Sequence, residues 1–202
     1  MPEAVRNDVD KGVRQTSTYA MITCTVSCIV KIITATLGKT SLQTVDCARS
    51  IVETAVIVVW WAVCTSKKIK LTPEREQRIE TVTRIGMILT AVLMAVYSVY
   101  RFLTGGGTTG AVQSGVVLAF IFGLNNINVY IGYMKRHSTI DTVEEQSRLF
   151  LVKAAADFCV CLTLHIIMIW PEWQYINLFQ LVSSLVVAGA MVFAGLKAAR
   201  DD

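Results

Sequence analysis

Long apolar runs, separated by short polar segments, fill most of this chain. Each run is long enough to cross the ~30 Å hydrocarbon core of a bilayer as a helix, at a rise of about 1.5 Å per residue. The runs lie at residues 18–37, 42–64, 80–103, 110–134, 149–170 and 174–197. The pattern therefore predicts an all-α, polytopic membrane protein with six transmembrane helices.

The run 42–64 differs from the others because it contains Asp46, Arg49 and Glu53. Spacings of three and four residues place these three charges on one stripe of a helix. A charge at the bilayer centre costs about 2.5–3.5 kcal/mol on insertion scales. We therefore expect this stripe to face the interior of the helix bundle, where it can find partners of opposite charge.

Composition agrees with a membrane protein and leaves no room for a second domain. Apolar residues make up 53% of the 202 residues, charged residues make up 17%, and the mean hydropathy is +0.53. We expect a cytoplasmic N-terminal segment at 1–17, a six-helix transmembrane domain at 18–198 and a tail at 199–202. Because acidic residues are mixed into the first fifteen positions, no cleavable signal peptide is expected.

The basic residues predict the orientation of the chain. Six helices place the N-terminus, the second and fourth loops and the tail on one side of the membrane, and nearly all loop Lys and Arg residues fall there (Arg6, Lys11, Arg14, Lys67, Lys68, Lys70, Arg75, Arg78, Lys135, Arg136, Arg148, Lys197 and Arg200). Only Lys39 and Arg101 fall on the other side. The positive-inside rule then makes both termini cytoplasmic. The net charge of +4 reflects this topology, so nucleic acid is not an expected partner.

Further polar residues interrupt the other apolar runs. Lys31 lies in the first run, and Asn125, Asn126 and Asn128 lie in the fourth, where amides can form interhelical hydrogen bonds. In the fifth run, Lys153 and Asp157 are four residues apart and so share a helix face. The six cysteines lie mostly inside runs without CxxC spacing, which favours packing roles over a thiolate metal site. At the first turn, we expect Gly38 to end a helix and Ser41 to cap the next one.

Four stretches in this order resemble the cation diffusion facilitator family, the six-helix exporters of zinc and related divalent cations. The stretches are VSCIVKIITATLGKTSLQTVDCARSIVE, EREQRIETV, QSRLFLVKAAADF and WPEWQYINLF. The resemblance covers most of the chain and implies the six-helix fold, cation transport and a dimer. The cytoplasmic domain that family members carry after the sixth helix has no counterpart before Asp202.

The resemblance also shows where this chain departs from the family. Members hold the metal between helices two and five, on a His or Asp and an Asp four residues later. The corresponding pairs here are Arg49 with Glu53 and Lys153 with Asp157, although alignment on Ser147 or Trp170 shifts the second pair by a few residues. An Arg side chain offers only donors, so we expect no metal and no cofactor. If a metal were bound, its ligands would be Asp46, Glu53 and Asp157.

These observations leave two functions open. In the first, the protein is a secondary transporter that works by antiport, and its charged residues handle protons or a small cation: Asp46, Arg49, Glu53, Lys153, Asp157 and Lys31. In the second, it is a non-transporting membrane subunit with a structural or regulatory role in a larger complex. A cavity lined by Glu53 and Asp157 favours the first, whereas a dry and fully paired cluster favours the second.

The sequence contains no motif of a soluble enzyme, and no enzymatic activity is expected. Besides lipid, the expected partners are a second copy of the chain or another membrane protein. Small residues on the last run, at Ser184, Ala188, Ala190 and Ala194, are suited to close helix contacts between protomers.

Overall fold

The computed structural model describes residues 3–38, 40–65, 73–105, 112–135 and 141–197, and these form six helices and no strand. In chain order the helices are α1 Glu3–Gly38, α2 Ser41–Thr65, α3 Pro73–Leu103, α4 Gln113–Lys135, α5 Asp141–Ile169 and α6 Ile176–Lys197. The prediction of an all-α chain with six helices is confirmed within this described part.

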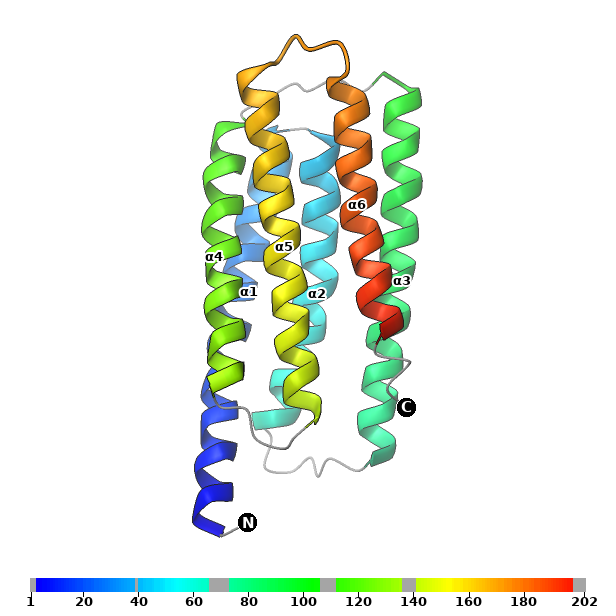
Figure 1. Ribbon diagram of the computed structural model, residues 1–202. Coiled ribbons are helices and arrows are strands. Elements are labelled where there is room, and N and C mark those ends of the chain that lie inside the picture. The colour runs from blue at the N-terminus through cyan, green and yellow to red at the C-terminus, as the bar shows by residue number, and fades with distance from the viewer. Residues whose placement is uncertain (1–2, 39, 66–72, 106–111, 136–140, 198–202) are drawn as a thin grey trace.

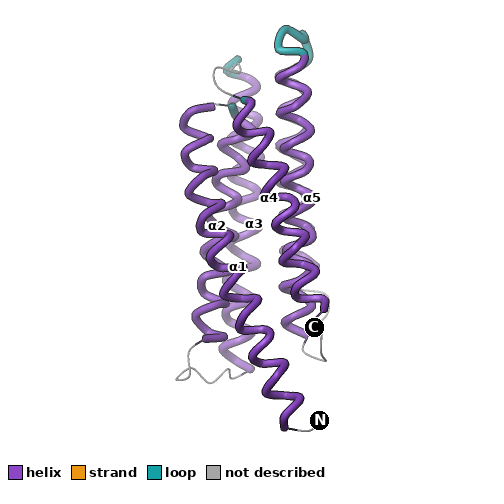
Figure 2. Tube along the Cα trace, turned by 90° about the vertical axis from the view of Figure 1, so that its left-hand side faces the viewer, coloured by secondary structure: helices purple, strands orange, loops and turns teal. Residues whose placement is uncertain are grey.

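The six helices run up and down alongside one another (Figure 1). α1 begins and α6 ends at the lower end of the bundle in Figure 1, while the α1–α2 turn and the α5–α6 connection lie at its upper end. α3 and α6 pack together on one side, and α1, α2, α4 and α5 form the rest of the bundle. The side view in Figure 2 shows α1 continuing below the other helices. This arrangement brings α1, α2 and α5 around a shared interior.

Five of the helices are long and apolar enough to cross a membrane. The candidate spans are Arg14–Gly38, Arg84–Leu103, Gln113–Lys135, Ser147–Ile169 and Ile176–Phe193, with mean hydropathies of 1.6 to 1.9. Large apolar side chains such as Ile29, Val96, Leu162 and Phe193 point outward and remain exposed. Hydrocarbon is the solvent that such a surface fits. The chain is therefore consistent with a multi-pass integral membrane protein.

Several helices begin at positions other than those that the apolar runs predict. α1, α3 and α5 begin at Glu3, Pro73 and Asp141, earlier than residues 18, 80 and 149, so the segment 1–17 is largely a helical extension of the first span. Hydropathy marks only the part of a helix that suits hydrocarbon, whereas polar residues continue the helix into water. α4 and α6 begin later than predicted, although residues 110–111 lie outside the described part.

The turn between α1 and α2 is capped by Thr40 rather than by Ser41. α1 ends at Gly38, as predicted, and α2 begins at Ser41. The Thr40 hydroxyl accepts a hydrogen bond from the Gln43 backbone N–H at 3.0 Å and donates one to Gln43 Oε1 at 2.9 Å. Thr40 and Gln43 thus have the residue types and spacing of a capping box.

The small residues of α6 pack within the chain. Ser184 and Ala188 are buried, and Ala188 forms an apolar cluster with Ala91 of α3. Ser183 accepts a hydrogen bond from Thr163 of α5 at 2.9 Å. The face at Ser184 and Ala188 that the sequence offered for contacts between protomers is therefore used for contacts with neighbouring helices of the same chain.

Candidate charge-network site

Six ionisable side chains from three helices meet inside the bundle. Each is buried, with exposed fractions between 1 and 6%. We call the group the charge network: Lys31 of α1, Asp46, Arg49 and Glu53 of α2, and Lys153 and Asp157 of α5. Three cations and three carboxylates give it no net formal charge, which is the condition under which charges are tolerated at membrane depth.

Asp157 joins the three helices. Its Oδ1 accepts hydrogen bonds from Lys31 Nζ at 2.7 Å and from Arg49 Nη2 at 2.5 Å. Its Oδ2 accepts a hydrogen bond from Asn126 Nδ2 of α4 at 2.7 Å. A buried carboxylate needs such charged and hydrogen-bonding partners to remain ionised. Asp157 therefore links α5 directly to α1, α2 and α4.

Arg49 faces all three carboxylates of the network. Besides Asp157, its Nη2 lies 2.8 Å from Asp46 Oδ1, and its Nε lies 3.7 Å from Glu53 Oε1. Asp46 also forms an ion pair with Lys31, in which Lys31 Nζ lies 2.8 Å from Asp46 Oδ2. Among the described residues, no acceptor forms a hydrogen bond with Arg49 Nη1. The guanidinium is thus the central cation of the network, and one edge of it is left for other contacts.

Lys153 and Glu53 form the lower part of the network. Lys153 Nζ lies 3.2 Å from Glu53 Oε2 and 3.5 Å from Cys24 Sγ of α1. The same ammonium lies 5.5 Å from the centre of the Phe150 ring, a cation–π distance. Lys153 therefore pairs with Glu53, its neighbour across the helix interface, rather than with Asp157 on its own helix.

The structure brings all six sequence-predicted residues together, including Lys31, for which the sequence indicated no partner. Sequence reasoning missed the roles of Asn126, which was expected only as a general helix contact, and of Cys24, which was read as packing. It also missed Phe122, whose ring centre lies 5.7 Å from Lys31 Nζ. Aromatic residues are common in apolar runs, so nothing in the pattern distinguished Phe122. For the turn before α2, the spacing Thr40-x-x-Gln43 was the sequence signal that could have identified Thr40 as the helix cap.

The three carboxylates do not assemble as a metal centre. No group of three His, Cys, Asp or Glu side chains in the described residues is placed to hold a metal ion. Arg49 stands between Asp46, Glu53 and Asp157, the ligands that a bound metal would need. Of the two histidines, His165 is exposed on α5, and His137 lies outside the described residues.

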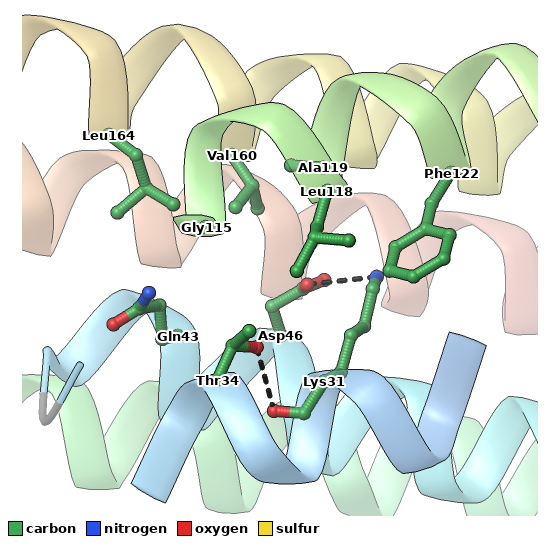
Figure 3. Close-up of a pocket in the computed structure, with 10 residues that line it drawn as sticks. All are labelled: Lys31, Thr34, Gln43, Asp46, Gly115, Leu118, Ala119, Phe122, Val160 and Leu164. Atoms are coloured by element: carbon green, nitrogen blue, oxygen red, sulfur yellow. Dashed lines mark hydrogen bonds and ion pairs between the residues drawn. The ribbon is translucent and has the colours of Figure 1, made fainter. Parts of the chain in front are cut away.

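Two small cavities adjoin the network. The upper one has a volume of about 20 Å³ and is lined by Lys31, Asp46 and Gln43 among others (Figure 3). The lower one, of about 10 Å³, is lined in part by Lys31, Lys153 and Asp157. Lys31 and Phe122 line both. Each cavity has room for about one water molecule, so little space adjoins the network at these two places.

Polar contacts between α1 and α4 accompany the network. Tyr19 donates a hydrogen bond to Asn125 Oδ1 at 2.9 Å, and Asn128 Nδ2 lies 3.5 Å from the same tyrosine oxygen. The Ser17 and Tyr133 hydroxyls share a hydrogen bond of 3.1 Å. The prediction that asparagines of the fourth run make interhelical hydrogen bonds is confirmed. Direct polar bonds thus align α4 against α1 below the network.

Comparison with known proteins gives no family for this chain. No family model matches it, and no curated protein is significantly similar to it.

Proposed function

We propose that the chain spans the membrane six times with both termini in the cytoplasm. α2 contains 25 residues, enough to cross a bilayer. Its charged residues face the interior, while Ile51, Val58 and Val59 are exposed on its outer side. In Figure 1 the beginnings of α1, α3 and α5 and the end of α4 lie at the lower end of the bundle. These helix ends include Arg6, Lys11, Arg14, Arg75, Arg78, Lys135 and Arg148, which supports assigning this end to the cytoplasmic side.

We propose that the protein is a secondary transporter for protons or another small cation and that the charge network is its central site. This proposal rests on one oxygen atom, Asp157 Oδ1, which forms ion pairs with both Lys31 of α1 and Arg49 of α2. A cation that enters or leaves this point changes the contacts of three helices at once. Alternating access requires such coupling between occupancy and helix arrangement.

The chemistry of the network favours protons or a monovalent cation as the transported species. A divalent ion at the carboxylates would lie beside the Arg49 guanidinium, which donates but does not coordinate and which repels cations at close range. Lys31 differs from Arg49 in that an ammonium can release its proton. Because Lys31 lines both cavities, we assign Lys31 as the cation of the network that releases and takes up a proton.

Reconstitution in liposomes tests this function. We expect the native protein to dissipate an imposed pH or cation gradient faster than protein-free liposomes, as followed with an enclosed fluorescent indicator. Glu53→Ala and Asp157→Ala should reduce the flux to background. Gly189→Ala is the matched control, because a Cβ at Gly189 meets no atom within 4 Å. Background flux in the native protein and in all variants would remove the transport proposal.

A non-transporting membrane subunit is the second candidate. The extensive pairing of the six charges favours it, as does the absence of Glu53 from the residues lining the two cavities described above. Paired buried charges persist in proteins as devices that specify packing. Background flux in well-folded native protein, together with a loss of stability in Glu53→Ala and Asp157→Ala, would support this second candidate.

A further inference from the structure

The side-chain amide of Gln43 is held in one orientation just above the charge network. Gln43 lies in the first turn of α2 and is 5% exposed. The Thr40 hydroxyl donates a hydrogen bond to its Oε1 at 2.9 Å. Because the oxygen side of the amide is engaged by Thr40, the two N–H donors of Nε2 point the other way.

Two glycines make room for this amide. A Cβ at Gly38, where α1 ends, would overlap Gln43 Oε1. A Cβ at Gly115, in the first turn of α4, would lie 2.5 Å from Gln43 Nε2 and 3.0 Å from Leu164 Cδ1. A contact below 3.0 Å forces one of the groups to move. The two glycines therefore allow α1, α2 and α4 to close around Gln43.

Gln43 Nε2 borders the upper cavity and forms no hydrogen bond there with any residue in the described part of the chain. The cavity has a volume of about 20 Å³, enough for one water molecule. In Figure 3, the Gln43 amide lies at one end of the group of lining side chains, and the Lys31–Asp46 pair lies toward the other. Thr34 also lines the cavity, and its hydroxyl donates a hydrogen bond to the Lys31 backbone carbonyl at 3.1 Å. The apolar lining residues are Leu118, Ala119, Phe122, Val160 and Leu164.

We propose that this cavity binds a single water molecule, which accepts a hydrogen bond from Gln43 and relays protons between the upper end of the bundle and Asp46. A proton that reaches the water from above is taken up on its oxygen, while another of its hydrogens passes to a carboxylate oxygen of Asp46. The water keeps two hydrogens, and Asp46 becomes neutral. This inference rests on the proposed transport function and names the proton as the species that enters from this side.

The chemistry of the cavity selects water over a metal cation. Its upper end presents N–H donors of Gln43, which do not coordinate a metal cation. At its other end, the negative charge of Asp46 is already paired with the Lys31 ammonium at 2.8 Å. A hydrated ion is also larger than one water molecule. Neither the lining groups nor the size of the cavity excludes a proton, because a proton is transferred by exchanging O–H bonds through a hydrogen-bonded water.

Neutralising Asp46 changes the network in a defined way. Lys31 loses its pair with Asp46 at 2.8 Å but keeps Asp157 at 2.7 Å. Arg49 loses one of its three carboxylates. The weakened Lys31–Asp46 contact joins α1 to α2, and the weakened Arg49–Asp46 contact lies within α2, whereas the contacts to α5 remain. Proton arrival from above thus weakens the contact between the two helices that meet at the Gly38 turn.

Hydroxyl-radical footprinting tests the water site without relying on transport. Radiolysis of a bound water labels its neighbours, so Leu118 and Leu164 should be labelled more strongly, relative to intrinsic reactivity, than the buried Phe150, which does not line the cavity. Gly115→Ala should reduce this labelling by filling the cavity wall. Gly189→Ala, whose new Cβ meets open space, should leave it unchanged. Labelling of Leu118 and Leu164 no stronger than that of Phe150 in the native protein would overturn the water site.

Proton flux in liposomes tests the relay. Gly115→Ala should lower the flux by about tenfold, the equivalent of one buried hydrogen bond. Gln43→Leu, which removes the anchoring amide without filling the cavity wall at Gly115, provides a second variant if Gly115→Ala folds poorly. Normal flux in Gln43→Leu, with labelling lost, would overturn the relay and leave the transport function intact. Labelling in the native protein, with background flux in both the native protein and the variants, would overturn the relay together with the transport function. The water site would then stand.

Discussion

Arg49 Nη2 lies 2.5 Å from Asp157 Oδ1, although 108 residues separate the two in the chain. The same guanidinium reaches Asp46 and Glu53 on its own helix. This single contact therefore connects the acidic stripe of α2 to α5. It places a permanent positive charge among the three carboxylates, on a side chain that does not leave.

Asp157→Asn should destabilise the protein strongly. The change leaves the buried Lys31 and Arg49 short of a negative partner, and breaking a buried pair from one side costs about 3–5 kcal/mol. We expect a lower midpoint of thermal unfolding in detergent. Glu172→Gln is the control, because Glu172 is an exposed acidic residue in the α5–α6 connection. Equal midpoints for the two variants would contradict a central role for Asp157.

Glu53 and Lys153 should be energetically coupled. Glu53→Gln and Lys153→Met each leave one buried charge without its main partner at 3.2 Å, whereas the double variant removes both charges. We expect the double variant to be more stable than the sum of the single effects implies, with a coupling of about 0.5–3 kcal/mol. Unfolding measurements on all four proteins give this value. Additive effects would mean that the two side chains do not interact.

Lys31→Arg should separate charge pairing from proton exchange. The substitution keeps a positive group between Asp46 and Asp157, but a guanidinium does not release its proton under these conditions. We expect a folded protein with proton flux near background in liposomes. Lys135→Arg, at an exposed position on α4, is the matched control and should transport normally. Native flux in Lys31→Arg would show that Lys31 acts only as a fixed charge.

Zinc should not bind tightly at neutral pH. The Arg49 guanidinium lies within reach of all three carboxylates and excludes a divalent ion from them. Isothermal titration calorimetry of the purified protein should show no specific heat of binding, and flux should be insensitive to chelators. Micromolar binding that Asp157→Ala abolishes would show that the interpretation of Arg49 and Lys153 is wrong.

Gly123→Ala should weaken the packing of α4 against α5. A Cβ at this position would lie 3.0–3.2 Å from three ring carbons of Phe158, whose ring also packs edge-on against Phe120. Overpacking of this kind costs about 1–3 kcal/mol. The unfolding midpoint should fall, whereas Gly189→Ala should leave it unchanged or raise it slightly. A midpoint equal to that of the native protein would mean that the Phe158 ring shifts freely.

Much of the fold follows from hydropathy and helix periodicity. The apolar runs located the six helices, but they misplaced the beginnings of α3 and α5, because polar residues before 80 and 149 continue the helix beyond the apolar stretch. Ser41 was a reasonable cap by residue type, yet Thr40 takes that role. The choice between adjacent hydroxyl residues depends on backbone angles at the turn, which a residue pattern does not specify.

The sequence by itself determined which charges share a helix face, because about 3.6 residues per turn fixes the stripe of Asp46, Arg49 and Glu53 and the pair of Lys153 with Asp157. Only the tertiary structure decided their partners: Asp157 with Lys31 and Arg49, and Lys153 with Glu53. The physical reason is that the rotation and axial offset of each helix are set by the packing of the whole bundle. A different rotation or offset of α1, α2 or α5 would change these partners without altering the pattern along the chain.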